Sequence, residues 1–107
     1  MSFTLDDLAA LIKARRKDDA STSYTKSLLD AGAPRIAKKF GEEAVETIIA
    51  AMESDRGALL NEAADMLYHL LVLLEARDIP LEEVLRELER RTQQSGLAEK
   101  ASRGAKG

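Results

Sequence analysis

Four carboxylates stand at helical spacing in two segments that otherwise resemble protein core. Glu43 and Glu46 are three residues apart, and Glu62 and Asp65 repeat this spacing in the next apolar stretch. An α-helix advances about 100° per residue, so each pair lies on one face of its helix. Acidic side chains are normally left in water, and their neighbours here are mostly Val, Ile, Leu and Met. This pattern calls for a chemical explanation.

Either pair alone is explained by a stripe that faces solvent. Two pairs on consecutive helices are more informative, because a short turn can bring the two faces together. Unpaired carboxylates in one cleft repel one another and lose hydration, at a cost of about several kcal/mol each. A cation between them removes that cost. Ligands that are all oxygen atoms favour a hard divalent ion, Mg²⁺ or in its place Mn²⁺, over zinc or copper.

The chain has a single histidine, His69, and the metal site does not need it. A lone histidine on a helix is more often packed or hydrogen-bonded than bound to a metal. Di-iron carboxylate bundles use Glu-x-x-His on two helices, whereas here the second pair ends in Asp65 and the histidine follows four residues later. The oxidase interpretation is therefore disfavoured.

Magnesium held by a few carboxylates usually completes its coordination shell with water and substrate phosphates. Chemistry on a phosphate ester or a phosphoanhydride is therefore the predicted use of the site. The sequence has neither a GxxxxGK[ST] phosphate loop nor a GxSxG nucleophile elbow. Basic side chains outside such a loop must then contact the phosphates, and Lys39 shares the helix face of Glu43.

Helices must position these residues, because no alternating strand pattern competes with the helical periodicity. The chain has 107 residues, of which 45% are hydrophobic and 33% charged, and it is rich in good helix formers. We expect one all-α domain over residues 1–107, a bundle of four to five helices with an ordered core at about 4–93 and a basic tail at 94–107. The expected helices are about 4–16 with Thr4 as N-cap, a short helix ending near Gly32, about 34–53 with Pro34 in first position, a long apolar helix from a Ser or Asp cap in "SDRG" to about 77, and a last helix opened by Pro80.

Charge and composition exclude several other functions. The formal charge of -3 gives no reason to expect binding to nucleic acid or to an anionic membrane. The lack of cysteine excludes disulfides and thiolate sites and is compatible with the cytoplasm, where we place the protein. The longest aliphatic run, residues 70–74, is too short to cross a bilayer, and the first ten residues lack the features of a signal peptide. So apolar a fourth helix predicts burial against a second subunit in a homodimer.

The two acidic motifs, ExxE at 43–46 and ExxD at 62–65, resemble the signature of the MazG-type all-α nucleotide pyrophosphohydrolases. Longer segments narrow this resemblance, and together they are similar to the phosphoribosyl-ATP pyrophosphatase family over about residues 4–103. These segments are "SYTKSLL" at 23–29, "IAKKFGEEAVE" at 36–46, "NEAADMLYHLLVLL" at 61–74 and "SGLAEKASR" at 95–103.

This resemblance implies hydrolysis of phosphoribosyl-ATP to phosphoribosyl-AMP and pyrophosphate, the second step of histidine biosynthesis, by a dimeric helical protein that uses Mg²⁺. It makes Glu42 an outer-sphere ligand or general base next to the metal ligands, which are Glu43, Glu46, Glu62 and Asp65. Lys39 is the first choice for contacting substrate phosphate. The weaker candidates for that role are Lys26, Lys38, Lys100 and Arg103.

Two other functions stay open at this point. One is a pyrophosphohydrolase of the same superfamily that clears noncanonical deoxynucleoside triphosphates. The other is a noncatalytic helical interaction module whose acids only solvate the bundle. A preference for deoxynucleoside triphosphates over phosphoribosyl-ATP would favour the first alternative. Replacing Glu46 or Asp65 with Ala tests the second, because a noncatalytic module has no metal-dependent hydrolysis to lose.

Overall fold

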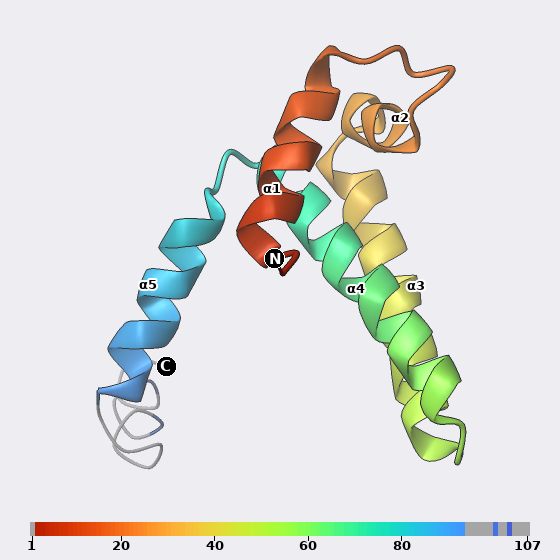
Figure 1. The fold of residues 1–107 in the computed structure, drawn as a ribbon, viewed down its shortest axis with the longest axis vertical. Coiled ribbons are helices and arrows are strands. Elements are labelled where there is room, and N and C mark those ends of the chain that lie inside the picture. Colours follow the sequence, from red (N-terminus) through yellow and green to blue (C-terminus); the bar gives the residue numbers. More distant parts are fainter. Residues whose placement is uncertain (1, 94–99, 101–102, 104–107) are drawn as a thin grey trace.

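A computed structural model describes residues 2–93, Lys100 and Arg103. Within these residues the chain forms five α-helices and one short 3-10 turn and has no strand, which confirms the all-α prediction (Figure 1). The elements are α1 (Leu5–Ala14), the 3-10 turn η1 (Arg15–Lys17), α2 (Tyr24–Ala31), α3 (Ala33–Met52), α4 (Arg56–Ala76) and α5 (Leu81–Thr92).

Side-chain caps begin the helices where the sequence predicts them. Thr4 and Asp7 form a capping box at α1, in which each side chain accepts the other residue's backbone N–H at 3.0 Å. Asp55 caps α4 by accepting from the backbone N–H of Ala58 at 3.0 Å. The first helix is shorter than predicted, because its last turn tightens into η1.

Gly32 makes the sharp connection between α2 and α3. Its φ of +93° is a value that side chains disfavour, so glycine is the residue suited to this turn. The helix then begins at Ala33, which puts Pro34 at the second helical position rather than the predicted first. The shift costs no hydrogen bond, because the first four backbone N–H groups of a helix have no acceptor within the helix.

The hairpin of α3 and α4 is the largest packed unit, and α1 and α2 lie at its upper half (Figure 1). Helix α1 packs on α4, and α2 contacts both α3 and α4. One cluster of fully buried side chains joins these four helices: Ile12, Leu28, Ile36, Leu71 and Val72.

Helix α4 ends in a motif that redirects the chain. The backbone N–H of Ile79 bonds to the carbonyl of Leu74 at 2.9 Å, and Asp78 adopts a left-handed φ of +57°. Helix α5 then leads away from the α3–α4 hairpin (Figure 1). It has no fully buried residue, and its apolar Leu85 and Leu88 are exposed.

The outward side of the α3–α4 hairpin is apolar and uncovered. On α3 the exposed apolar residues are Val45, Ile48, Ile49 and Met52, and Met52 is 84% exposed. The sequence places these side chains in a core-like segment, but within one chain they do not enter a core. Leu59, Leu60 and Leu67 of α4 are exposed as well. By length and composition alone α4 could cross a membrane, which is weak evidence because core helices of soluble proteins also satisfy that criterion.

Candidate metal centre

The α3–α4 hairpin brings acidic side chains together between its two helices. Glu43 of α3 and Glu62 and Asp65 of α4 each offer a carboxylate oxygen, and these three oxygens all lie within 4.8 Å of one another. Glu43 and Glu62 are partly buried, whereas Asp65 is exposed. We call these three residues, with Glu46 at their edge, the acidic cluster.

Glu62 shows how poorly the charges of the acidic cluster are compensated. Its Oε2 atom is buried and has no hydrogen-bond partner among the described residues. The pKa of Glu62 is raised to about 7, first by a hydrogen bond with Glu46, then by lost hydration, and then by the charges of Glu46, Glu43 and Asp65. The two observations agree, because neutral Glu62 can donate to Glu46, whereas ionised Glu62 leaves a buried oxygen without a donor.

Glu46 lies outside the group of three oxygens, and its side chain is exposed. Its effect on the pKa of Glu62 nevertheless places its carboxylate next to the cluster. The four acids from the two sequence pairs thus lie in one region, and three of them have carboxylate oxygens within 4.8 Å of one another. An all-oxygen donor set with one buried, unpartnered oxygen fits a hard divalent cation such as Mg²⁺.

Lys39 lies at the edge of this region. Its Nζ is 3.5 Å from Oε1 of Glu42, one turn further along α3. The pKa of Lys39 is raised by Tyr24 first, then by Glu42 and more weakly by Glu43. The ammonium group therefore lies against the carboxylate of Glu42. Glu42 pairs with Lys39 and is not one of the three clustered carboxylates.

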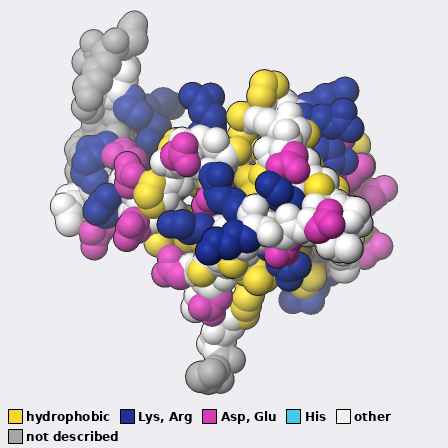
Figure 2. Space-filling model, turned by 90° about the horizontal axis from the view of Figure 1, so that it is seen from above, with side chains coloured by type: hydrophobic (Ala, Val, Ile, Leu, Met, Phe, Trp, Pro, Cys, Tyr) yellow, Lys and Arg dark blue, Asp and Glu magenta, His cyan; other side chains and the backbone are white. Residues whose placement is uncertain are grey.

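Among the described residues, no interaction joins the acidic cluster to Lys26 or Lys38, two of the other basic residues predicted to contact phosphate. Lys26 forms an ion pair with Asp30 at 2.8 Å, and the side chain of Lys38 is exposed. Lys100 and Arg103 are also exposed, while the rest of the tail expected to accompany them lies outside the described residues. On the face shown in Figure 2, Lys and Arg side chains alternate with acidic and apolar ones.

A group of aromatic side chains adjoins the acidic cluster, and it includes Tyr24, for which the sequence analysis predicted no role. His69 is buried, with Nδ1 2.8 Å from the backbone oxygen of Asp65 and Nε2 3.2 Å from the hydroxyl of Tyr24. This placement agrees with the interpretation of His69 as a packed, hydrogen-bonded residue. The segment "SYTKSLL", which carries part of the family resemblance, was the available signal for Tyr24.

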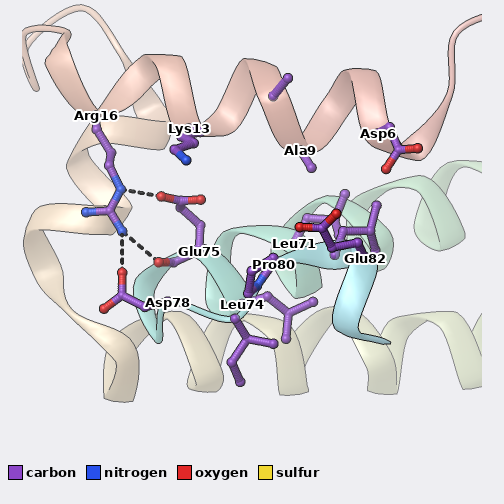
Figure 3. A pocket seen from close by; sticks show the side chains of 13 residues that line it. Asp6, Ala9, Lys13, Arg16, Leu71, Leu74, Glu75, Asp78, Pro80 and Glu82 are labelled. Atoms are coloured by element: carbon purple, nitrogen blue, oxygen red, sulfur yellow. Dashed lines mark hydrogen bonds and ion pairs between the residues drawn. The ribbon is translucent and has the colours of Figure 1, made fainter. Parts of the chain in front are cut away.

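A separate cavity of about 530 Å³ lies between α1, α4 and the start of α5 (Figure 3). Its floor is apolar, and on one wall Arg16 of η1 reaches Glu75 and Asp78. A nitrogen of the guanidinium donates to the backbone oxygen of Glu75 at 2.7 Å and lies 3.5 Å from the Asp78 carboxylate. No member of the acidic cluster lines this cavity. We call it the ion-paired cavity.

Comparison with known proteins connects the acidic cluster to a family. The sequence model described as phosphoribosyl-ATP pyrophosphohydrolase matches residues 5–92, a range that contains all five helices and the whole acidic cluster. The chain belongs to the phosphoribosyl-ATP pyrophosphohydrolase family. The match also includes Lys39, Tyr24 and His69.

Individual members of the phosphoribosyl-ATP pyrophosphohydrolase family are similar along nearly the whole chain. The phosphoribosyl-ATP pyrophosphatase 1 of Rhodopseudomonas palustris is 59% identical over 101 residues, covering 94% of each chain. The protein of the same name from Bradyrhizobium diazoefficiens is 61% identical over 101 residues, 94% of this chain and 95% of its own. The phosphoribosyl-ATP pyrophosphatase of Methylobacterium radiotolerans is 58% identical over 102 residues, 95% of each chain.

Proposed function

We propose that this protein hydrolyses phosphoribosyl-ATP to phosphoribosyl-AMP and pyrophosphate with Mg²⁺, as a cytoplasmic step of histidine biosynthesis. The names of its relatives support the substrate. The observation that carries the proposal is the acidic cluster, in which Glu62 has a buried oxygen with no donor and a pKa raised to about 7. Such a cluster suits a cation that arrives with a polyphosphate substrate.

The residues that would hold Mg²⁺ are Glu43, Glu46, Glu62 and Asp65. A bound ion supplies charge neutralisation on the triphosphate and lowers the pKa of a coordinated water. Glu62 must give up its proton for this purpose, and its Oε2 then gains the positive partner that the folded chain alone does not provide. If these acids hold the ion, the α-phosphorus would lie beside them, between α3 and α4.

Two residues beside the acidic cluster complete the proposed site. Lys39 would contact phosphate oxygens through its ammonium group, whose pKa is raised by Tyr24 first and then by Glu42. Glu42 shares an ion pair with that ammonium and is the candidate to accept a proton from the attacking water. When Lys39 turns toward phosphate, the Glu42 carboxylate is released for this role.

The deciding experiment measures pyrophosphate release from phosphoribosyl-ATP, with and without Mg²⁺, against a panel of canonical and noncanonical deoxynucleoside triphosphates. We expect hydrolysis that requires the ion and a kcat/KM at least about 100-fold higher for phosphoribosyl-ATP, equivalent to about 2.7 kcal/mol of discrimination. Preference for a deoxynucleoside triphosphate would support the nucleotide-clearing alternative. Absence of metal-dependent hydrolysis on every substrate would support the noncatalytic module.

The proposed active form is a homodimer. Residues Val45, Ile48, Ile49 and Met52 lie on the side of α3 turned away from Glu43, and all four are exposed. Leu60 and Leu67 of α4 are exposed apolar residues as well. Several large apolar side chains exposed on one element are typical of a protein interface, and a second copy offers the same surface.

Light scattering at micromolar concentration tests the dimer. We expect twice the chain mass for the unaltered protein and a shift to monomer for Ile48→Glu, which puts a charge in the centre of the apolar surface. Gln93→Glu adds the same charge at the exposed end of α5 and serves as the matched control. A monomer at every concentration of the unaltered protein would contradict the proposal.

A further inference from the structure

Helix α5 carries an apolar stripe that the rest of the chain leaves largely uncovered. Its members are Leu81, Val84, Leu85 and Leu88, which are spaced i, i+3, i+4 and i+7 along one face of the helix. Leu81 packs against the core, Val84 is half-buried, and Leu85 and Leu88 are 41% and 50% exposed. The stripe thus begins on the body of the protein and becomes more exposed as α5 leads away from it (Figure 1).

Helix α5 gains little stability from its own chain. An isolated helix shorter than about 12 to 15 residues is marginal in water, and most helices in proteins are stabilised by burial of their apolar face. Helix α5 has 12 residues, and none of them is fully buried. A stable α5 therefore needs a surface that covers its stripe.

The turn before α5 sets the direction of the helix. The backbone N–H of Ile79 bonds to the carbonyl of Leu74 at 2.9 Å. Arg16 donates to the backbone oxygen of Glu75 at 2.7 Å and lies 3.5 Å from the carboxylate of Asp78. These bonds on both sides of the turn hold α5 away from the α3–α4 hairpin of its own chain (Figure 1).

A hollow between α5 and the start of α1 leaves room beside the stripe. Its volume is about 460 Å³, and the residues that line it are Asp6, Glu82, Leu85, Arg86 and Glu89. Leu85 of the stripe thus faces an open space with charged edges. An apolar helix from another molecule could lie along the stripe without displacing any part of this chain.

The apolar side of α3 has the same pattern and the same length as the stripe on α5. Val45, Ile48, Ile49 and Met52 are also spaced i, i+3, i+4 and i+7, and they are between 54% and 84% exposed. Two helices with such stripes pack by placing the side chains of one between those of the other. Within one chain α3 and α5 diverge, so a contact between the two stripes requires a second copy (Figure 1).

We infer that α5 is an arm exchanged between two copies of this chain, with its apolar stripe packed on the apolar side of α3 in the other copy. Two-fold symmetry makes this contact twice, because each copy contributes one arm and one α3. Both uncovered stripes of each chain are then buried by a single kind of contact. The inference rests on the proposed homodimer and deepens it, since it names α5, rather than a second α3, as the element that covers Ile48 and its neighbours.

Cross-linking tests the exchange cleanly, because the chain has no cysteine of its own. Leu88→Cys puts a thiol on the arm, and Ile48→Cys puts one on the apolar side of α3. The two variants are mixed, treated with a mild oxidant and separated on a non-reducing gel. We expect a disulfide-linked pair of chains from the mixture and little from either variant alone. Glu83→Cys lies on the opposite side of α5 and, mixed with Ile48→Cys, should give at least about tenfold less of the linked pair, because a disulfide needs its two Cα atoms within about 7 Å.

Three results would contradict the arm exchange. Ile48→Cys that links to itself as readily as to Leu88→Cys would mean that α3 meets a second α3. Leu88→Cys that links mainly to itself would mean that two α5 helices meet. A double variant that closes its disulfide within one chain, at a rate independent of concentration, would mean that α5 covers its own α3.

Light scattering on the unaltered protein separates failure of this inference from failure of the proposed homodimer. Twice the chain mass without the mixed cross-link rejects the exchange alone, whereas a monomer at every concentration rejects both. Leu88→Glu provides a measurement that needs no disulfide, and it should raise the Kd of the dimer at least about tenfold in analytical ultracentrifugation. Glu83→Gln, the control on the opposite side of α5, should change this Kd less than about twofold. Equal Kd values for the two variants would also reject the exchange.

Discussion

Helix α4 carries two partly buried glutamates, Glu62 and Glu75, in opposite electrostatic surroundings. Glu75 faces the ion-paired cavity, where the guanidinium of Arg16 pairs with its carboxylate and also bonds to its backbone oxygen (Figure 3). Glu62 faces Glu43, Glu46 and Asp65. Burial and acidity are thus shared by both sites, and only the presence of a compensating cation from the chain distinguishes them. This missing compensation is the reason why we propose the acidic cluster as a site for an external cation.

Glu87 on α5 shows the same contrast in its pKa. Hydrogen bonds from Arg90 and Arg91 lower the pKa of Glu87 to about 2, whereas the pKa of Glu62 is raised to about 7. The residue type is identical, so the difference in pKa comes from the surroundings: arginine donors at Glu87, and acidic neighbours and lost hydration at Glu62. Each prediction below either removes a charge from one of these regions or supplies the missing cation.

The largest effect is expected from Asp65→Asn in the acidic cluster. The amide keeps the shape of the carboxylate and removes its charge, so the affinity for Mg²⁺ should fall. We expect kcat/KM to drop at least about 100-fold, which is more than is usual for residues that only hydrogen-bond to a metal ligand. Asp78→Asn makes the same change in the ion-paired cavity and should leave kcat/KM within about twofold. Steady-state kinetics of both variants check the prediction, and similar losses would contradict it.

The helices that carry the acidic cluster were predictable from local sequence. Thr4, Pro34 and Gly32 mark helix ends through their backbone and capping preferences. The spacing of three residues between Glu43 and Glu46 puts both side chains on one face of a helix. What local sequence could not give is the pairing of distant residues. Arg16 and Glu75 are 59 residues apart, and Tyr24 and His69 are 45 apart. These partners are chosen by the way helices pack, which periodicity does not specify.

The same limit explains the apolar side of α3. Periodicity shows that Ile48 and Met52 share a face, and an apolar face is ordinarily turned inward. The hairpin instead turns Glu43 toward α4 and leaves Ile48 63% exposed. Local pattern identifies the two faces of this helix correctly and cannot tell which one meets the neighbouring helix of the same chain.

The second effect concerns pH and metal together. Between pH 4.5 and about 7 the folded chain keeps a proton on Glu62 that the unfolded chain has lost, so without divalent ions the free energy of unfolding should fall as pH rises through this window. Mg²⁺ at about 100 times its Kd should restore about 2.7 kcal/mol, because it binds the folded chain alone. Thermal unfolding between pH 5 and 8, with EDTA or Mg²⁺, measures both terms.

Two substitutions isolate the part played by Glu62. Glu62→Gln removes the titration and should raise the melting temperature at pH 8 in EDTA, relative to the unaltered protein. Glu87→Gln should not change the pH dependence of the melting temperature between pH 5 and 8. The lowered pKa of Glu87 means that its contribution to stability is lost only as pH falls toward about 2. A metal-free melting temperature that depends on pH identically in all three proteins would refute the role given to Glu62.

A smaller effect is expected when the compensating cation is removed. Arg16→Met keeps much of the apolar length of the side chain and deletes its bonds to Glu75 and Asp78. The guanidinium is partly exposed, so screening limits the loss to about 1 kcal/mol in the free energy of unfolding. Urea unfolding measures this loss, and kcat/KM should stay within about twofold. A large loss of activity would mean that the ion-paired cavity belongs to the active site.

The smallest effect is expected at Asp78, where the strain of a left-handed backbone opposes the contribution of an ion pair to the free energy of unfolding. This residue holds a φ of +57°, where glycine is free of strain, while its side chain is 89% exposed and lies 3.5 Å from Arg16. Relief of the left-handed backbone by Asp78→Gly is worth about 1 kcal/mol, and an exposed ion pair about 0.5 kcal/mol. We therefore expect Asp78→Gly to stabilise the protein by about 0.5 kcal/mol in urea unfolding, and Asp78→Asn, which keeps the strain, to destabilise it slightly. Destabilisation by both substitutions would show that the ion pair of Asp78 with Arg16 contributes more to stability than relief of the backbone strain does.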